Sequence, residues 1–136
     1  MNDSSAPLLD AAALRQLAKA KPEQCRCTLK SCRGWESVSD DRWPVAQMVA
    51  AGTLREPLPD GQTEHTFEEF HPEGTRYESP DAPIAPRYFP FNRCDVHACT
   101  QCGCAVLKYT EYGGYYIDDR VRAVQADLVT DAQPEA

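Results

Sequence analysis

Cysteine placement constrains this chain more than any other feature of its sequence. The seven cysteines form two clusters, one within residues 25–32 and the other within residues 94–104. An odd number argues against a secreted disulfide scaffold, because such scaffolds normally pair an even set. In a reducing compartment, clustered thiols are more often metal ligands or redox groups. The sequence therefore predicts a thiol-based site that joins two distant parts of the chain.

Length and composition narrow the class of protein. A chain of 136 residues has the usual size of one domain, so residues 1–136 are predicted to fold as a single domain. The eleven prolines favour a loop-rich fold with short strands. No apolar run is long enough to cross a bilayer, and the N-terminus lacks the features of a signal peptide. We therefore expect a cytoplasmic protein that does not bind membranes.

The charge distribution bears on the kind of partner. The net charge is −7 at pH 7, which disfavours diffuse attraction to nucleic acid. However, Arg26, Lys30 and Arg33 lie among the first cysteines, so nucleic-acid binding through this basic cysteine loop stays open as an alternative. An acidic surface suits a protein partner better, since complementary charges guide protein association.

A helix is predicted over residues 7–21. Leu9, Ala13 and Leu17 recur at a spacing of four, which places them on one helical face. The helix is expected to end before Pro22, because proline cannot continue a helix.

A second helix is predicted over residues 40–51, after a first cysteine loop at residues 25–35. Val45, Met48 and Val49 fit the i, i+3, i+4 pattern of an amphipathic helix. The glycine that follows this segment is a common helix stop.

Residues 65–124 are predicted to form an antiparallel β meander. Its clearest hairpin joins residues 104–112 to residues 115–121 through Gly113 and Gly114. Both glycines tolerate the positive φ angles that a type I′ turn requires. Apolar side chains also alternate on the two flanking segments, as expected for paired strands.

Weaker patterns surround that hairpin. Residues 71–74, "HPEG", are typical of a β-turn, with residues 75–79 as the return strand of another hairpin. Residues 87–92 are predicted to be a short aromatic edge strand. Residues 119–129 fit both a continued strand and a C-terminal helix, so both alternatives remain. Residues 130–136 are expected to be a flexible tail.

The second cysteine cluster contains the sequence Cys99-Thr-Gln-Cys102-Gly103. A tight turn of this kind aims two thiolates at one point, and the glycine lets the chain reverse and leave as a strand. The motif resembles the knuckle of zinc-ribbon proteins, in which such a turn precedes a β-hairpin, and residues 97–117 follow that order. The resemblance covers these residues only, and it implies a Zn²⁺ site beside a zinc-ribbon-like hairpin.

A structural zinc ion takes four ligands, so two more must come from elsewhere in the chain. Cys27 and Cys32 are the preferred pair, because a loop folds two sulfurs onto one ion more easily than an extended strand does. Cys25 is a substitute for either of them. The predicted site of Cys27, Cys32, Cys99 and Cys102 would clip the N-terminal part of the chain to the β meander.

Other uses of the thiols remain open. Cys104 is expected to point away from the ion or into the core, and His97 is an alternative ligand in place of a first-cluster cysteine. Buried free thiols would need no metal at all. Cys99 and Cys102 could also form a redox dithiol, although no helix is predicted after them to stabilise a thiolate.

A hydrolytic zinc site is a further alternative. The pair of motifs His71-Pro-Glu73 and Cys99-x-x-Cys102 is similar to the His-x-Glu and Cys-x-x-Cys elements of the zinc nucleoside deaminases. In that family the histidine and the cysteines hold zinc and the glutamate transfers protons. The chain departs from the family at Ala98, where the proline is missing, and in the β-turn expected around the histidine.

Together these patterns predict a small α+β domain, with short N-terminal helices packed on an antiparallel β meander that carries a zinc-ribbon-like hairpin. The function that they favour is a non-catalytic, cytoplasmic zinc-binding protein that presents a surface to a protein partner. Nucleic-acid binding and zinc-dependent hydrolysis remain as alternatives.

Overall fold

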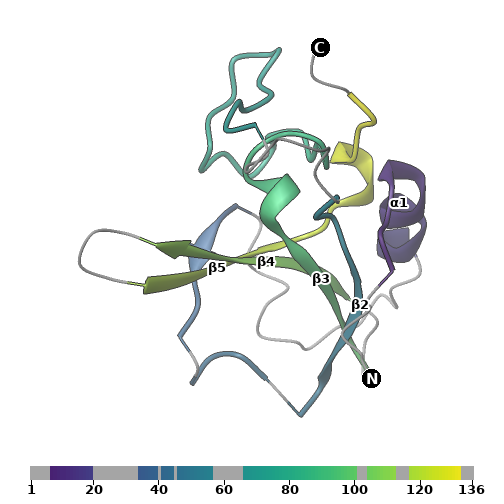
Figure 1. Cartoon of the computed structure of the whole chain (residues 1–136), viewed down its shortest axis with the longest axis vertical. Coiled ribbons are helices and arrows are strands. Elements are labelled where there is room, and N and C mark those ends of the chain that lie inside the picture. The colour runs from purple at the N-terminus through teal and green to yellow at the C-terminus, as the bar shows by residue number, and fades with distance from the viewer. Residues whose placement is uncertain are drawn as a thin grey trace.

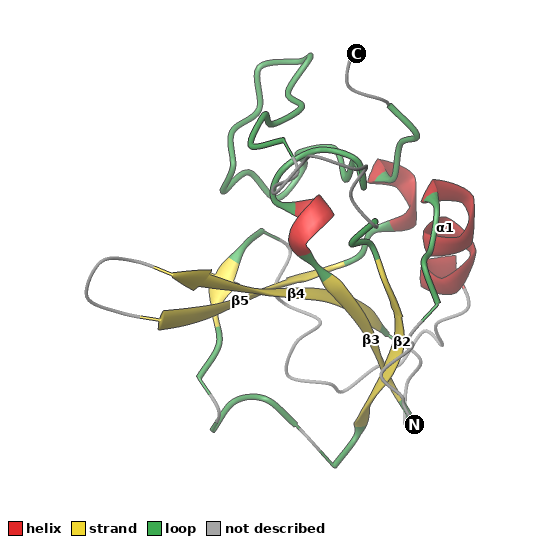
Figure 2. Cartoon of the chain, viewed as in Figure 1, coloured by secondary structure: helices red, strands yellow, loops and turns green. Residues whose placement is uncertain are grey.

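A five-stranded antiparallel sheet and one short α-helix make up most of the regular structure of the described chain (Figures 1 and 2). The structure is a computed structural model, and it describes residues 7–19, 34–39, 41–44, 46–56, 66–100, 104–112 and 117–132. The elements are α1 (Ala11–Lys19), β1 (Glu36–Ser37), β2 (Met48–Thr53), η2 (Phe91–Arg93), β3 (Asp95–Cys99), β4 (Ala105–Tyr112), β5 (Ile117–Ala123) and η3 (Ala126–Leu128). The predicted α+β class is therefore confirmed. Across these ranges no helix is long and apolar enough to span a membrane.

The strands lie in the order β1-β5-β4-β3-β2, and all neighbours are antiparallel. β3, β4 and β5 follow one another along the chain and form a meander. Across its middle, Asp95 pairs with Lys108 and Lys108 pairs with Val121. β2 is an edge strand, and its register with β3 shifts between Ala50 and Gly52. Successive side chains of each strand therefore alternate between the two faces of the sheet.

The predicted hairpin that ends the meander is confirmed as the pair β4 and β5, although its two turn glycines lie outside the described residues. The pairing extends to Tyr112 and Ile117. Of the two alternatives for residues 119–129, the strand is present as far as Ala123 and the short helix η3 follows it. Val121 is fully buried and pairs with Lys108 of β4, so pairing with β4 favours the strand over the helix.

The first predicted helix is confirmed as α1, although it begins later than predicted. The Asp10 carboxylate accepts a hydrogen bond from the Ala13 backbone N–H at 2.8 Å, which is the arrangement of an N-cap. Ala11, Leu14 and Ala18 are buried on one face of the helix. The last predicted helical residues lie outside the described part of the chain.

The residues before α1 extend the edge of the sheet instead of starting the helix. The Leu9 N–H donates to the Thr53 carbonyl oxygen, and the Thr53 N–H donates to the Pro7 carbonyl oxygen, each at 2.9 Å. A Cβ atom at Gly52 would lie 2.7 Å from the Leu9 side chain. This glycine therefore permits a close approach of two chain segments, and it does not end a helix.

The helix predicted over residues 40–51 is wrong, because Met48–Thr53 is the edge strand β2. Met48 pairs with Cys99 of β3 and packs against the sheet, whereas Val49 is exposed. The apolar spacing that was predicted to be helical therefore occurs in a half-exposed strand. Pairing with a segment distant in the sequence decides the conformation here, as it often does for strands.

Residues 66–94 contain turns, η2 and a single bridge, so two further strand predictions are wrong. The turn at residues 71–74 is present, with Gly74 at a φ of 84°, but residues 75–79 do not return as a strand. Residues 87–92 form a turn and η2. Aromatic rings of this region pack on one another instead of alternating along an edge strand.

The sheet separates two apolar clusters. The larger core contains Trp35, Leu107 and Tyr109, and α1 packs onto it through Leu14. The smaller one lies on the opposite face and contains two of the cysteines. We call it the thiol cluster, and its buried members are Val38, Cys99, Cys104, Val106, Val121 and Ala123.

Candidate functional site

Cys99 is the member of the predicted zinc set whose position the structure describes. It is the last residue of β3 and is 2% exposed. Its backbone N–H donates to the Cys104 carbonyl oxygen at 2.9 Å, so β3 and β4 close directly on the connection between them. The other members of the predicted set lie outside the described residues: Cys25, Cys27, Cys32 and Cys102.

Cys99 and Cys104 are neighbours in the thiol cluster, and both are buried. The prediction that Cys104 turns into the core is therefore confirmed. In the part of the chain that the structure describes, no three His, Cys, Asp or Glu side chains gather in a way that could hold a metal ion. A zinc site at Cys99 consequently needs ligands from the undescribed cysteines.

Cys94 has a structural environment. Its side chain is fully buried, and its Sγ donates to the Pro90 carbonyl oxygen at 3.3 Å. Burial raises the pKa of the Cys94 thiol well above its ordinary value. A protonated, inaccessible thiol of this kind acts as a small apolar side chain.

Gly34 and Trp35 lead into β1 from the end of the sheet at which β3 ends. β1 runs antiparallel to β3, because three antiparallel pairings separate the two strands. The N-terminal end of β1 therefore lies at the same end of the sheet as the C-terminal end of β3, where Cys99 is located. Glu36 and Asp95 lie at the same level of the sheet, through Val121 and Lys108.

The distance between the two cysteine clusters follows from the strand spacing. Three strand spacings place β1 about 14 Å from β3, and Cys99 lies four residues, about 13 Å, farther along β3 than the level of Glu36. The four-residue step from Glu36 back to Cys32 extends at most about 14 Å, so Cys32 must turn directly toward Cys99 for the two thiols to share an ion. Gly34, just before β1, lies against the loop on the side of the larger core. A Cβ atom at Gly34 would lie 2.6 Å from the Glu78 carbonyl oxygen, beside Pro80. The Pro80 carbonyl accepts hydrogen bonds from the end of β5 that pairs with the start of β4.

The elements of the deaminase resemblance are not brought together. Both ring nitrogens of His71 have hydrogen-bond partners within its own turn, Thr75 Oγ1 at 2.8 Å and Glu69 Oε1 at 2.7 Å. His71 lines a small cavity on the side of the larger core, whereas Cys99 lies in the thiol cluster on the opposite face. Glu73 is exposed. This placement gives no support to a shared hydrolytic site.

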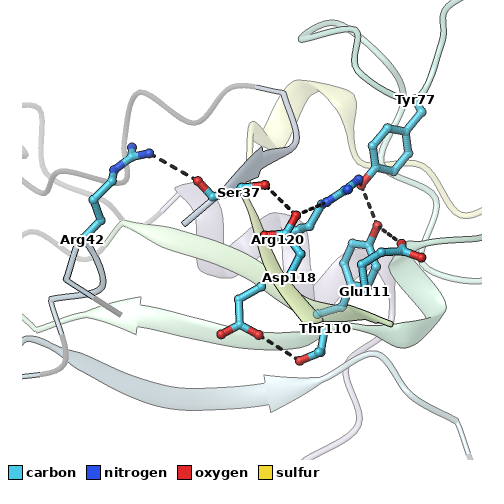
Figure 3. Close-up of polar contacts among 9 residues, drawn as sticks. Ser37, Arg42, Tyr77, Thr110, Glu111, Asp118 and Arg120 are labelled. Carbon is cyan, nitrogen blue, oxygen red and sulfur yellow. Dashed lines mark hydrogen bonds and ion pairs between the residues drawn. The ribbon is translucent and has the colours of Figure 1, made fainter. Parts of the chain in front are cut away.

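A polar network links β1 and the loop of residues 66–94 to the β4–β5 pair (Figure 3). Arg120 donates from Nη1 to the Tyr77 hydroxyl at 3.1 Å and from Nε to Asp118 at 2.9 Å. Asp118 also accepts from the Ser37 hydroxyl at 2.6 Å, and this hydrogen bond lowers the pKa of the Asp118 carboxyl. The Tyr77 and Tyr109 hydroxyls share a hydrogen bond. Burial raises the pKa of both tyrosines, so they act as neutral hydrogen-bonding groups.

A buried arginine holds another part of the loop. Arg122 is fully buried, and its Nη2 donates to the Ala82 carbonyl oxygen at 2.6 Å. Burial lowers the pKa of its guanidinium to about 10, so the side chain remains charged near neutral pH. Its position in a strand that alternates Asp118, Arg120 and Arg122 gives no sequence signal for such burial.

One surface feature is a pocket that the sequence did not predict. It has a volume of about 880 Å³ and lies where β3 begins and β4 continues past it. His97, which was considered as a metal ligand, lines this pocket instead. Burial, and then the charge of Lys108, lower the pKa of His97, and its ring meets the Trp43 ring edge-on at 5.1 Å. We call this feature the β4 groove; the β4 residues that line it are Lys108, Tyr109, Thr110 and Glu111.

Comparisons with family models, curated proteins and solved structures found no match for this chain. The resemblances to zinc ribbons and to deaminases therefore rest on their short motifs alone. The function has to be argued from the surroundings of Cys99 and from the shape of the sheet.

Proposed function

We propose that the protein is a non-catalytic, cytoplasmic zinc-binding protein that acts by binding a protein partner. Its structural site consists of Cys27, Cys32, Cys99 and Cys102, with Cys25 able to replace one of the first pair. The zinc-ribbon-like hairpin of this proposal is the β4–β5 pair, which follows the Cys-x-x-Cys connection between β3 and β4. No catalytic residue is part of the proposal.

The observation that carries the proposal is the hydrogen bond between Cys99 N–H and the Cys104 carbonyl oxygen. It closes the connection of residues 100–103 at its base. Cys102 belongs to this short connection and is three residues from Cys99 in the sequence. A constrained connection favours metal binding, because two ligands are held near each other before the ion arrives.

The other half of the site comes from the first cysteine loop. Gly34 precedes β1 at the end of the sheet where β3 ends, and the proposal places Cys27 and Cys32 beyond it. Four thiolates would then bind one ion in the tetrahedral arrangement of structural zinc sites. Such sites contribute apparent free energies on the order of 10 kcal/mol to folding, comparable with the whole stability of a small domain.

The role in protein binding is supported by the charge and by exposed apolar side chains. The net charge of −7 suits a basic partner. Phe67 and Ile117 are 59% and 72% exposed. Phe67 lines the β4 groove, and Ile117 pairs with Tyr112 at the far end of the β4–β5 pair. No described residue favours nucleic-acid binding in the same way, and the basic residues of the first cysteine loop lie outside the described ranges.

Elemental analysis of the full chain, purified reduced and without chelator, tests the zinc site. We expect about one zinc ion per chain, lost in Cys99→Ser and in Cys27→Ser and retained in Cys25→Ser. Cys94→Ala is the matched control, because it removes a buried thiol outside the proposed set and should retain zinc. A folded, reduced wild-type chain without metal would rule out the proposal and leave buried thiols as the explanation of the cysteines.

A further inference from the structure

The open edge of β4 is the feature from which a further inference starts. β4 pairs with β3 from Ala105 to Lys108, and it pairs with β5 as far as Tyr112. Within the described ranges, residues 109–112 have no neighbouring strand on the β3 side. Figure 1 shows the β4–β5 pair extending beyond the rest of the sheet. An exposed strand edge of this kind is a template for pairing with another extended chain.

The direction of the backbone groups along this edge follows from two hydrogen bonds. The Cys104 carbonyl accepts from Cys99 on β3, whereas the Ala105 carbonyl accepts from Val124 after β5. Backbone groups of successive residues alternate between the two neighbours of an antiparallel strand. The N–H and C=O groups of Thr110 therefore point away from β5, toward the open edge.

The β4 groove runs along this edge and has two different walls. Side chains alternate along β4, so Tyr109 lies on the wall where Phe67 and Phe89 line the groove, and Thr110 lies on the wall with Asp119. The volume of about 880 Å³ lies within the range of pockets that hold ligands. An extended peptide would place alternate side chains against an aromatic wall and against a charged wall.

Asn92 lines the groove from the protein side. Its side chain is 2% exposed, and the amide nitrogen donates to the Thr66 carbonyl oxygen at 3.0 Å. The oxygen Oδ1 has no hydrogen-bond partner, which is uncommon for a buried acceptor in native proteins.

The charges of the groove indicate which peptide would bind. Asp95 is neutralised by Arg55, at 2.8 Å. Asp119 accepts a hydrogen bond from the Thr110 hydroxyl, and Glu111 accepts one from Tyr109. In the part of the chain that the structure describes, neither of these two carboxylates has a basic side chain at ion-pair distance. Two further basic side chains line the groove and lie over aromatic rings, Arg93 over Phe67 and Lys108 over Trp43, each at 4.3 Å. Asp119, on the wall opposite Tyr109, therefore favours a basic side chain on the occupant.

We infer that the open edge of β4 binds an extended segment of a partner protein by strand addition, and that this segment alternates apolar and basic residues. Main-chain hydrogen bonds to the Thr110 backbone supply the pairing, and the two walls of the groove select the side chains. The inference rests on the proposed role in protein binding. It does not require zinc, because no residue of the groove belongs to the proposed metal site.

Synthetic peptides that alternate lysine with valine or phenylalanine test the inference on the full chain. Each peptide is compared with two N-methylated forms, one methylated on the amides of each edge. Strand addition uses one peptide edge, so we expect one methylated form to bind at least tenfold more weakly and the other to bind as the parent does. Absence of binding by the parent peptides, or equal weakening by both forms, would overturn the inference.

Two substitutions at one position provide the matched protein variants. Thr110→Pro removes the N–H that faces the open edge, where proline leaves the β5 pairing intact, and we expect it to weaken peptide binding at least tenfold. Thr110→Val keeps that N–H and loses the hydrogen bond to Asp119, so its affinity should stay within about twofold of wild type. Equal affinities of all three proteins would contradict strand addition.

Sedimentation of the peptide-free protein identifies a competing occupant. A wild-type dimer that Thr110→Pro converts to a monomer would show that a second copy of the chain fills the edge, and it would overturn the assignment to a partner. Zinc content is measured on the same samples. Metal-free protein that binds the peptides would overturn the zinc site and support strand addition. Zinc-loaded protein that does not bind the peptides would support the zinc site and overturn strand addition.

Discussion

The backbone N–H of Cys99 donates to the carbonyl oxygen of Cys104 over 2.9 Å, and it thereby joins the ends of β3 and β4 around residues 100–103. The two thiols of these residues are buried in one apolar cluster. The connection therefore has a hydrogen-bonded, buried base, and Cys99 of the Cys-x-x-Cys sequence belongs to it. Metal binding at that connection and plain burial of thiols have different consequences for stability.

Removal of zinc should destabilise the wild-type chain. A chelator that strips the metal takes away the ligand-linked part of the folding free energy, so the midpoint of urea unfolding should fall strongly. Cys99→Ser should be destabilised at the outset and should not respond further to the chelator. Circular dichroism during urea titration measures both effects, and identical chelator responses of the two proteins would contradict a site at Cys99.

Cys104→Ala is the control for burial at the same place. It removes a sulfur from the thiol cluster but leaves the proposed ligands intact, so we expect a loss of about 1–2 kcal/mol and full retention of zinc. The chelator should still destabilise this variant as it does the wild type. Loss of zinc in Cys104→Ala would contradict the proposed ligand set and make Cys104 a ligand.

Trp35→Ala should destabilise the fold by about 3–5 kcal/mol. Trp35 is 8% exposed, and its ring lies 5.0 Å from the Tyr109 ring and 5.7 Å from the Phe91 ring. Trp43→Ala is the matched control, because Trp43 is half-buried and stacks on Lys108. Its loss should stay below about 2 kcal/mol. Denaturant unfolding followed by circular dichroism compares the two, and equal losses would contradict the position of Trp35 in the larger core.

Stability should fall in alkaline solution because of the Tyr77–Tyr109 pair. Burial raises the pKa of both hydroxyls above the ordinary value of 10.0. Above that pH the unfolded chain releases protons that the folded chain retains, so the free energy of unfolding decreases as the pH rises. Tyr109→Phe should flatten this decrease. Urea unfolding over about pH 8 to 11 measures the slope.

A slope in Tyr109→Phe that equals the wild-type slope would contradict the Tyr77–Tyr109 pair as the origin of the effect.

Gly52→Ala should cost about 1–3 kcal/mol, as overpacking usually does. The added Cβ would lie 2.7 Å from the Leu9 side chain and 2.9 Å from the Pro7 carbonyl oxygen. Leu9→Ala removes the first of these obstacles, so the double variant should lose less stability than the sum of the two single variants. Strictly additive losses in urea unfolding would argue against the close approach of these segments.

Neighbouring residues were sufficient to predict two parts of the fold. The spacing of apolar residues indicated α1, and the Asp10 cap explains where it begins. Alternation around a Gly-Gly turn indicated the β4–β5 pair. In both cases the interactions that stabilise the element lie within a short stretch of chain, so the sequence pattern carries the information. The Cys-x-x-Cys motif could be recognised for the same reason.

Distant contacts decided the rest. Met48–Thr53 carries a helical spacing, yet it is a strand because β3 offers backbone partners that appear much later in the sequence. Residues 87–92 do not form the predicted strand, because aromatic rings from separate turns pack together there. For the candidate site, the sequence by itself determined which thiols are spaced as ligands. The tertiary structure alone decided that Cys99 and Cys104 are buried and that β4 keeps an open edge, because strand order and register depend on pairing between distant segments.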